Sequence, residues 1–169
     1  MSQFSEQVLE GLKKAYAAYF DIEEIHDGTA LKARCGYHMR DSQYVLVKKA
    51  ELWAAETHEY LYLWDAGHLD LDGVEDIFRR TLDDGEPRVK PHAQHMYTYL
   101  TAVAQLKKLK KRREFKLSLH GWMEFRIAAV DLSNGEITVN RAGKAMGKDL
   151  KRLTDRIISV NQKGEEKTQ

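Results

Sequence analysis

Cysteine and proline are both scarce in this chain of 169 residues. Cys35 is the single cysteine, so no disulfide can form within the chain, and this usage is typical of a reducing compartment. The chain holds two prolines, and no Pro-rich or Gly/Ser-rich stretch divides it as a linker would. We therefore expect a single domain over residues 1–162, followed by a flexible C-terminal tail over residues 163–169.

Long apolar runs are lacking as well. No stretch approaches the roughly 20 apolar residues needed to cross a bilayer, and the N-terminal segment lacks the basic start and apolar core of a secretory signal. These absences predict a cytoplasmic protein with no membrane partner. Residues that are apolar make up 43% of the chain and charged residues 31%, which is typical of a globular protein and excludes a disordered one.

Charge is unevenly divided along the chain, although the net charge is only +1. Residues 1–87 hold 9 Lys and Arg against 18 Asp and Glu, whereas residues 88–156 hold 16 against 6. This asymmetry is typical of a surface for an acidic partner or nucleic acid. It is equally typical of two halves that face each other, or that face their copies in a homodimer.

Apolar residues at a spacing of three and four predict three helices. The first covers residues 4–20. The second begins after Asp72 as N-cap and stops at Gly85, for which we expect a left-handed conformation. The third covers residues 140–160, with its basic residues on one side and an apolar stripe on the other. The stripe consists of Met146, Leu150, Leu153, Ile157 and Val160.

Alternation of apolar and polar residues predicts three strands before the second helix. They cover residues 29–39, 44–55 and 59–64, separated by short polar breaks at 40–42 and 57–58. Short breaks between consecutive strands favour antiparallel pairing, so we expect a meander.

Further strands are predicted after the second helix. Residues 96–106 have composition that suits a strand or a helix, and their aromatic and β-branched content favours a strand. Alternation returns over residues 115–132, with a bulge expected at Gly121. The pair Asn134-Gly135 predicts a tight hairpin turn before a return strand. The complete pattern predicts a single α+β domain of antiparallel meanders, with helices packed on the sheet.

Three segments of the sequence resemble a known family as a set. They are YHMRDSQYVLVKKAELW (37–53), KPHAQHMYTYLT (90–101) and FKLSLHGWMEFRIAAVDLSNGEI (115–137). The chain resembles a small, uncharacterised bacterial domain family that is common in anaerobic Firmicutes. The resemblance implies a bacterial, cytoplasmic protein and brings no catalytic residues with it.

Two short motifs contain residues that bind metals, Cys35-x-x-His38 and His92-x-x-His95. Thiolate and imidazole are good zinc ligands, and a gap of two residues lets two side chains approach one ion from a tight turn. In a strand, however, Cys35 and His38 point to opposite faces. We therefore expect histidines that serve the structure or the surface, with no stoichiometric metal and no cofactor.

A broader group of histidines offers candidates for proton transfer near neutral pH. We expect a polar cluster near one end of the sheet, formed by His38, His92, His95 and His120, with Asp41 or Glu51 as a possible acidic neighbour. The alternative is a structural role, in which these rings only form hydrogen bonds with neighbouring loops.

A run of basic residues after residue 106 and the basic side of the last helix could bind the phosphates of a nucleic acid. The candidate residues are Lys107, Lys108, Lys110, Lys111, Arg112, Arg113, Lys148 and Arg152. A solvated loop and a solvated helix face would explain the same residues.

No segment carries a catalytic or cofactor fingerprint, so the sequence leaves the function open. The favoured hypothesis is a non-catalytic interaction domain of a bacterial cytoplasmic protein, present as a homodimer. One alternative is a small metal-assisted hydrolase that uses the histidines. The other is a nucleic-acid-associated protein that uses the basic half of the chain.

Overall fold

The computed structural model describes residues 3–44, 51–65, 71–104, 113–116, 121–132 and 135–165. Within these ranges the chain forms three α-helices, one short 3₁₀ helix and seven strands. In chain order they are α1 (Gln3–Tyr16), β1 (Asp21–Glu24), β2 (Leu31–Tyr44), β3 (Glu51–Trp64), α2 (Leu71–Gly85), η1 (Glu86–Arg88), β4 (His95–Ala104), β5 (Arg113–Lys116), β6 (Trp122–Asp131), β7 (Glu136–Val139) and α3 (Lys144–Glu165).

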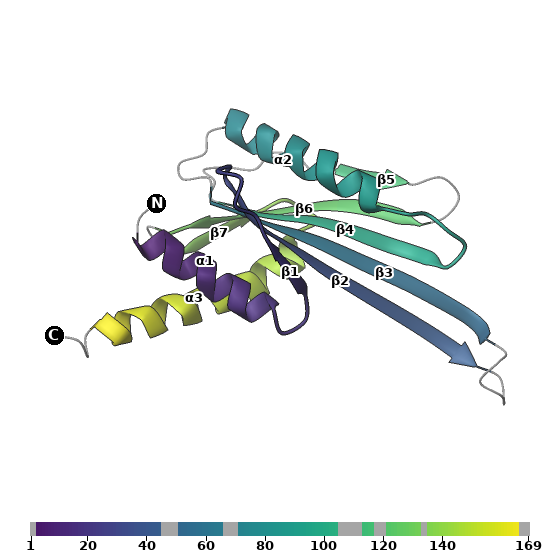
Figure 1. Ribbon diagram of the computed structural model, residues 1–169, viewed down its shortest axis with the longest axis horizontal. Coiled ribbons are helices and arrows are strands. Elements are labelled where there is room, and N and C mark those ends of the chain that lie inside the picture. Colours follow the sequence, from purple (N-terminus) through teal and green to yellow (C-terminus); the bar gives the residue numbers. More distant parts are fainter. Residues whose placement is uncertain are drawn as a thin grey trace.

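The strands form one mixed sheet in the order β1-β2-β3-β4-β6-β5, and β7 also pairs with β6 (Figure 1). The α+β class is confirmed, and the expectation of antiparallel meanders is only partly right, because the sheet is mixed. The pairs β3–β4 and β4–β6 are parallel. Because α2 lies between β3 and β4 in the chain, it carries the chain back across the sheet, and β4 then runs in the same direction as β3.

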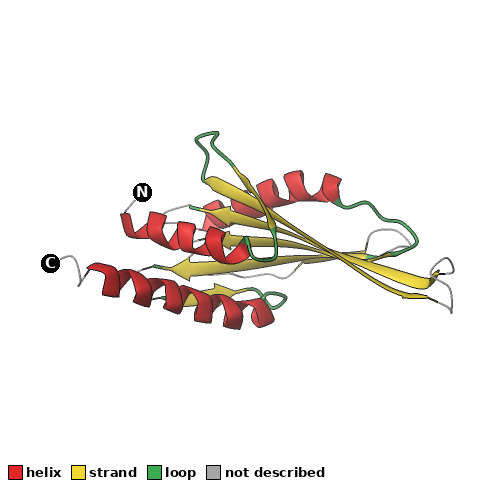
Figure 2. Cartoon of the chain, turned by 60° about the horizontal axis from the view of Figure 1, so that its bottom comes forward, coloured by secondary structure: helices red, strands yellow, loops and turns green. Residues whose placement is uncertain are grey.

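The two faces of the sheet are covered by different helices, so the protein has two apolar cores (Figures 1 and 2). Phe78 of α2 packs with Leu100 and Phe125 on one face. Val8 of α1 and Leu150 of α3 pack on the other. Strand alternation supplies both cores, and burial of each large side chain contributes about 1.5–3 kcal/mol. No described helix combines the length and apolarity needed to cross a membrane.

The predicted meander before α2 is a single long hairpin instead, preceded by β1, which the sequence pattern did not predict. β2 and β3 pair from Leu31–Trp64 to Tyr44–Glu51, so the expected breaks at 40–42 and 57–58 lie inside the strands. Polar side chains at these positions find partners across the hairpin, for example in the ion pair between Arg40 and Glu56. The turn itself falls outside the described residues.

The strand expected at 96–106 is confirmed as β4, and the return strand is confirmed as β7. The single strand expected at 115–132 is wrong, because β5 and β6 are separate antiparallel neighbours. Gly121 directly precedes β6 with a φ of 79° and does not form a bulge within a strand. Gly135 has the positive φ that the predicted turn requires, 70°. Its N–H donates to the carbonyl of Asp131, four residues earlier, and Asp131 pairs with Glu136, so the connection is longer than the tight turn predicted. Asn134 lies outside the described residues.

All three predicted helices are confirmed, with shifted ends. α1 stops at Tyr16, Asp72 is the second residue of α2, and α3 begins at Lys144 and continues through Glu165, into the expected tail. The late start of α3 has a local cause in Asn140, whose buried side chain donates to the carbonyl of Phe125 and accepts from the N–H of Gly143. On α3, Leu150 is buried but Val160 is 61% exposed, so the apolar stripe extends beyond the core.

Gly85 does not adopt the expected left-handed conformation. Its φ is −83°, and the chain continues directly into η1. A Cβ at this position would lie 2.7 Å from Cδ2 of Leu100 and 3.1 Å from the hydroxyl of Tyr62. Glycine is therefore required here because the end of α2 approaches the sheet closely, and backbone handedness plays no part.

Candidate functional site

A cluster of histidines with one glutamate lies on the sheet face that α2 covers. We call it the histidine cluster; its members are His38 on β2, Glu56 and His58 on β3, His92 in the loop before β4, and His95 at the start of β4. Glu56, His58 and Tyr62 alternate along β3 and therefore share a face. Since Tyr62 is buried in the core beneath α2, Glu56 and His58 lie farther along that same face. His38 pairs directly with His58 in the register of the hairpin.

A bulge brings His95 into the cluster. Glu56 pairs with His95 and Thr57 with Tyr97, so Met96 has no partner in the β3–β4 register. This extra residue places His95 on the same face as Thr98, to which its Nε2 is hydrogen-bonded at 2.8 Å. Strict alternation would have placed these two side chains on opposite faces.

The glutamate lies at the centre of the polar contacts in the cluster. Its Oε2 is 3.0 Å from Nε2 of His92 and 3.9 Å from Nε2 of His58. Its Oε1 accepts a hydrogen bond from Nη1 of Arg40 at 2.8 Å. One ligand atom from each of Glu56, His58 and His92 lies within 4.8 Å of the other two. This is a set of donors that a single metal ion can reach.

His58 is held between two other imidazoles. Its Nδ1 is 2.7 Å from Nδ1 of His38, so one ring donates a hydrogen bond to the other. Its ring stacks on that of His95, with centroids 5.9 Å apart and an angle of 9° between the planes. Burial lowers the pKa of His58, and the neighbouring His38 and His95 lower it further, while Glu56 acts in the opposite direction. His58 therefore favours the neutral form, which is the form that binds metals.

Comparison with known proteins assigns the chain to a family but does not give it an activity. The family described as "Domain of unknown function (DUF8052)" matches residues 5–152. The chain belongs to this family. No curated protein and no solved structure matches the chain. The match confirms the expected membership of an uncharacterised family, and the function has to be argued from the site itself.

Three of the four histidines predicted as a cluster do come together, namely His38, His92 and His95. His120 lies outside the described residues. Cys35 is on the opposite face, fully buried in the core beneath α1 and α3, as alternation along β2 predicted. Burial raises the pKa of its thiol to about 12, so Cys35 stays protonated and cannot serve as a thiolate ligand.

Two residues of the histidine cluster, Glu56 and His58, were missed by the sequence reasoning. Asp41, one of the acidic neighbours considered, is exposed on β2 and pairs with Ala55 in the register; the side chain of the other, Glu51, lies outside the described residues. A signal for these two residues was present in the sequence. Glu56, His58, Tyr60 and Tyr62 stand at every second position, which is typical of one face of a strand. The prediction of a break at residues 57–58 interrupted this alternation.

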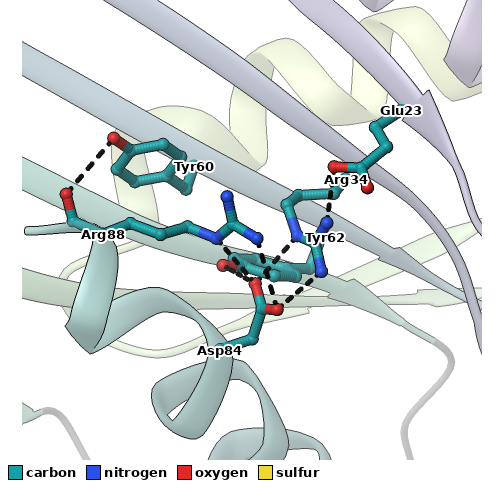
Figure 3. Close-up of polar contacts among 6 residues, drawn as sticks. All are labelled: Glu23, Arg34, Tyr60, Tyr62, Asp84 and Arg88. Carbon is teal, nitrogen blue, oxygen red and sulfur yellow. Dashed lines mark hydrogen bonds and ion pairs between the residues drawn. The ribbon is translucent and has the colours of Figure 1, made fainter.

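A second polar network lies at the end of α2 and shares no residue with the histidine cluster (Figure 3). Asp84 accepts two hydrogen bonds from Arg34, at 2.8 and 2.6 Å, and one at 2.7 Å from the hydroxyl of Tyr62. Arg88 donates to the same carboxylate at 3.0 Å, and Arg34 also pairs with Glu23. The network joins α2 and η1 to β1, β2 and β3.

The carboxylate of Asp84 is fully engaged in this network. Its partial burial alone would raise its pKa, but the hydrogen bonds from Arg88, Tyr62 and Arg34 outweigh burial and lower it. An arginine that approaches with two nitrogen atoms binds a carboxylate strongly and with defined geometry. We therefore assign this network to the stability of the fold, where it fixes α2 against the sheet.

The predicted basic surface is described only in part. Lys148 and Arg152 are exposed on α3, on the side expected from the helical pattern. Arg113 begins β5, and its side chain lies outside the described residues, as do residues 107, 108 and 110–112. A role of this surface in binding nucleic acid stays a prediction.

Proposed function

We propose that this chain is a metal-binding domain, which takes a divalent transition metal of the zinc class at Glu56, His58 and His92. The observation that carries the proposal is the mutual approach of their three ligand atoms to within 4.8 Å. Imidazole nitrogen and carboxylate oxygen are common ligands of zinc and its neighbours. From the sequence no stoichiometric metal was expected, and the candidate ligands were Cys35, His38, His92 and His95. The set proposed from the geometry omits Cys35, because its thiol lies on the other face.

The distances in the cluster suit an ion after small side-chain adjustments. Bonds of about 2.1 Å to a tetrahedral zinc ion place two ligand atoms about 3.4 Å apart. The Oε2 atom of Glu56 is 3.0 Å from Nε2 of His92 and 3.9 Å from Nε2 of His58. These two separations lie on either side of the ideal value. The third, between the ligand atoms of His58 and His92, is within 4.8 Å, so the side chains have to close around the ion as it binds.

Neighbouring groups hold two of these ligands in suitable states. Arg40 binds Oε1 of Glu56 and leaves Oε2 for the ion. If Nε2 of His58 binds the ion, its Nδ1 carries the proton and donates to Nδ1 of His38. Hydrogen bonds of this kind fix the orientation and tautomer of a metal-binding histidine.

His92 has to change its protonation when an ion binds. Its Nδ1 accepts a hydrogen bond from the backbone N–H of Gln94 at 3.3 Å, so its proton is on Nε2 and points to Glu56. Binding of the ion at Nε2 displaces this proton, and Nδ1 then carries a proton and no longer accepts from Gln94. A change at the Gln94 amide is therefore a specific sign that His92 binds through Nε2.

Solvent reaches the proposed ligands. The side chains of Glu56, His58 and His92 are 18%, 21% and 42% exposed, which leaves a path for an ion. Three protein ligands also leave the fourth position of a tetrahedral ion open to water, as in catalytic zinc sites. Metal-assisted hydrolysis is for this reason the second candidate function.

The proposal predicts one zinc site per chain. Protein without an affinity tag is treated with a chelator and then titrated with Zn²⁺ in a calorimeter. We expect His38→Ala to weaken binding about 10–100-fold, as loss of an outer hydrogen bond does. Removal of a direct ligand in Glu56→Gln, His58→Ala or His92→Ala should weaken it more than that. In ¹⁵N-resolved NMR spectra the Gln94 amide signal should move on saturation.

His26→Ala is the matched control, since this histidine is 81% exposed and lies outside the cluster. It should bind zinc as the natural chain does. A natural chain without a stoichiometric site, or a site that survives in all three ligand variants, would disprove the proposal.

The remaining sequence-based hypotheses stay predictions. They are the interaction domain, the homodimer, the nucleic-acid partner, the bacterial origin and the cytoplasmic location. A groove between α1 and α3, lined by apolar and charged side chains, supports the interaction domain and is independent of the metal proposal.

A further inference from the structure

A groove runs between α1 and α3 on the face of the sheet opposite the histidine cluster. The two helices lie side by side there (Figures 1 and 2). They are in close contact at Gly11, where an added Cβ would lie 2.7 Å from Cγ2 of Ile157. The groove has a volume of about 980 Å³.

The floor of the groove is apolar. Gly11 and Ala15 line it from α1, and Leu153, Ile157 and Val160 line it from α3. Ile157 is only partly buried, and Val160 is 61% exposed. Val160 is thus the end of the apolar stripe of α3, which a single chain leaves exposed there.

The groove is lined by charges of both signs. Glu6, Glu10 and Lys14 lie on the α1 side, and Arg156 lies on the α3 side. Glu10 already pairs with Lys13. Within the described part of the chain, neither Glu6 nor Arg156 has an ion-pair partner. One copy therefore offers the unpaired acid Glu6 on α1 and the unpaired base Arg156 on α3, across the same apolar lining.

We propose that a second copy of this chain occupies the groove, related to the first by a two-fold axis. A two-fold interface places the same surface of both copies in contact, so each contact occurs twice. The α1 side of the groove in one copy then faces the α3 side in the other. Glu6 pairs with Arg156 in both directions, and the two Val160 side chains are buried. The lining holds two acidic residues, Glu6 and Glu10, and two basic residues, Lys14 and Arg156, so it is complementary in charge to a second copy of itself.

Sedimentation equilibrium of the full chain tests the proposal, in buffer that contains a chelator so that metal binding plays no part. The natural chain should sediment as a dimer, at twice its mass of 19.5 kDa. Val160→Asp should raise the dissociation constant by a factor of ten or more and leave the melting temperature of the monomer unchanged, because Val160 is exposed. Met96→Asp is the matched control, since Met96 is 60% exposed on β4, outside the groove, and it should leave the dimer intact.

Charge reversal tests the pairing itself. Glu6→Arg and Arg156→Glu should each weaken the dimer, and the double variant should restore it, because the two charges then exchange places. A natural chain that is monomeric at high micromolar concentration overturns the proposal. So does a dimer that neither Val160→Asp nor the single charge reversals weaken.

Discussion

Replacing Asp84 with alanine is expected to lower the free energy of unfolding by about 3 kcal/mol. Removal of one partner from a buried ion pair costs about 3–5 kcal/mol, because the remaining charge is left without compensation. Asp84 is 29% exposed, so we expect the lower end of this range. The variant leaves Arg34 and the hydroxyl of Tyr62 without their shared acceptor (Figure 3). Urea denaturation of both proteins measures the difference.

Asp83→Ala is the control for this variant, because it removes the adjacent carboxylate, which is exposed. It should change the free energy of unfolding by less than about 0.5 kcal/mol. Equal effects of the two substitutions would show that the network adds no stability.

The contribution of Asp84 should also depend on pH. Its pKa is lowered in the folded protein, so the unfolded chain binds the proton more tightly. This stabilisation is therefore complete above the ordinary pKa of an aspartate, about 3.9. It is lost as the pH falls through the lowered pKa of the folded state. Denaturation curves of the natural chain and Asp84→Ala should thus approach each other in acid. A constant difference down to the lowest accessible pH would contradict this.

Replacing Gly121 with alanine is expected to destabilise the protein by about 3 kcal/mol or more. The new Cβ would lie 2.1 Å from Nδ1 of His95, and His95 is only 4% exposed and bonded to Thr98. Forcing extra atoms into a packed region costs about 1–3 kcal/mol, and the φ of 79° adds about 1–2 kcal/mol for a residue with a Cβ. Thermal and urea unfolding measure the sum.

Gly28→Ala separates the two causes. Gly28 has almost the same φ, 80°, but nothing lies within 4 Å of its added Cβ, so the variant should lose only about 1 kcal/mol. If Gly121→Ala costs no more than Gly28→Ala, the contact with His95 does not restrict position 121. The double variant Gly121→Ala with His95→Ala should lose less than the two single effects added together, because the clash is absent.

Residues in the turn and the helices could be predicted because their signals are short-range. Gly135 needs a positive φ wherever the chain reverses tightly, and this depends on its own backbone. Leu150 is buried because its spacing from the other apolar residues of α3 places it on one side of a helix. Tertiary contacts changed where such elements begin and end, as the side-chain bonds of Asn140 do at the start of α3.

The candidate site was predictable in its residue type and only partly in its members. His38, His92 and His95 were candidates because imidazole can transfer protons near neutral pH and can bind metals. Glu56 and His58 were missed because polar residues in mid-strand resemble a break until their cross-strand partners are known. His95 joins the cluster only through the bulge at Met96, and that bulge depends on the pairing of β3 with β4.

The sequence by itself determined the three helices, the α+β class, the strand at β4 and the positive φ of Gly135, because each depends on neighbours within a few residues. Only the tertiary structure decided the parallel pairing of β3 with β4 and of β4 with β6, the single long hairpin and the approach of α2 that requires Gly85. These features depend on contacts between residues distant in the chain, such as Gly85 with Leu100 or Arg34 with Asp84. Local periodicity predicts which face of a helix or strand a side chain occupies. It does not predict which other element covers that face, so it cannot predict such contacts.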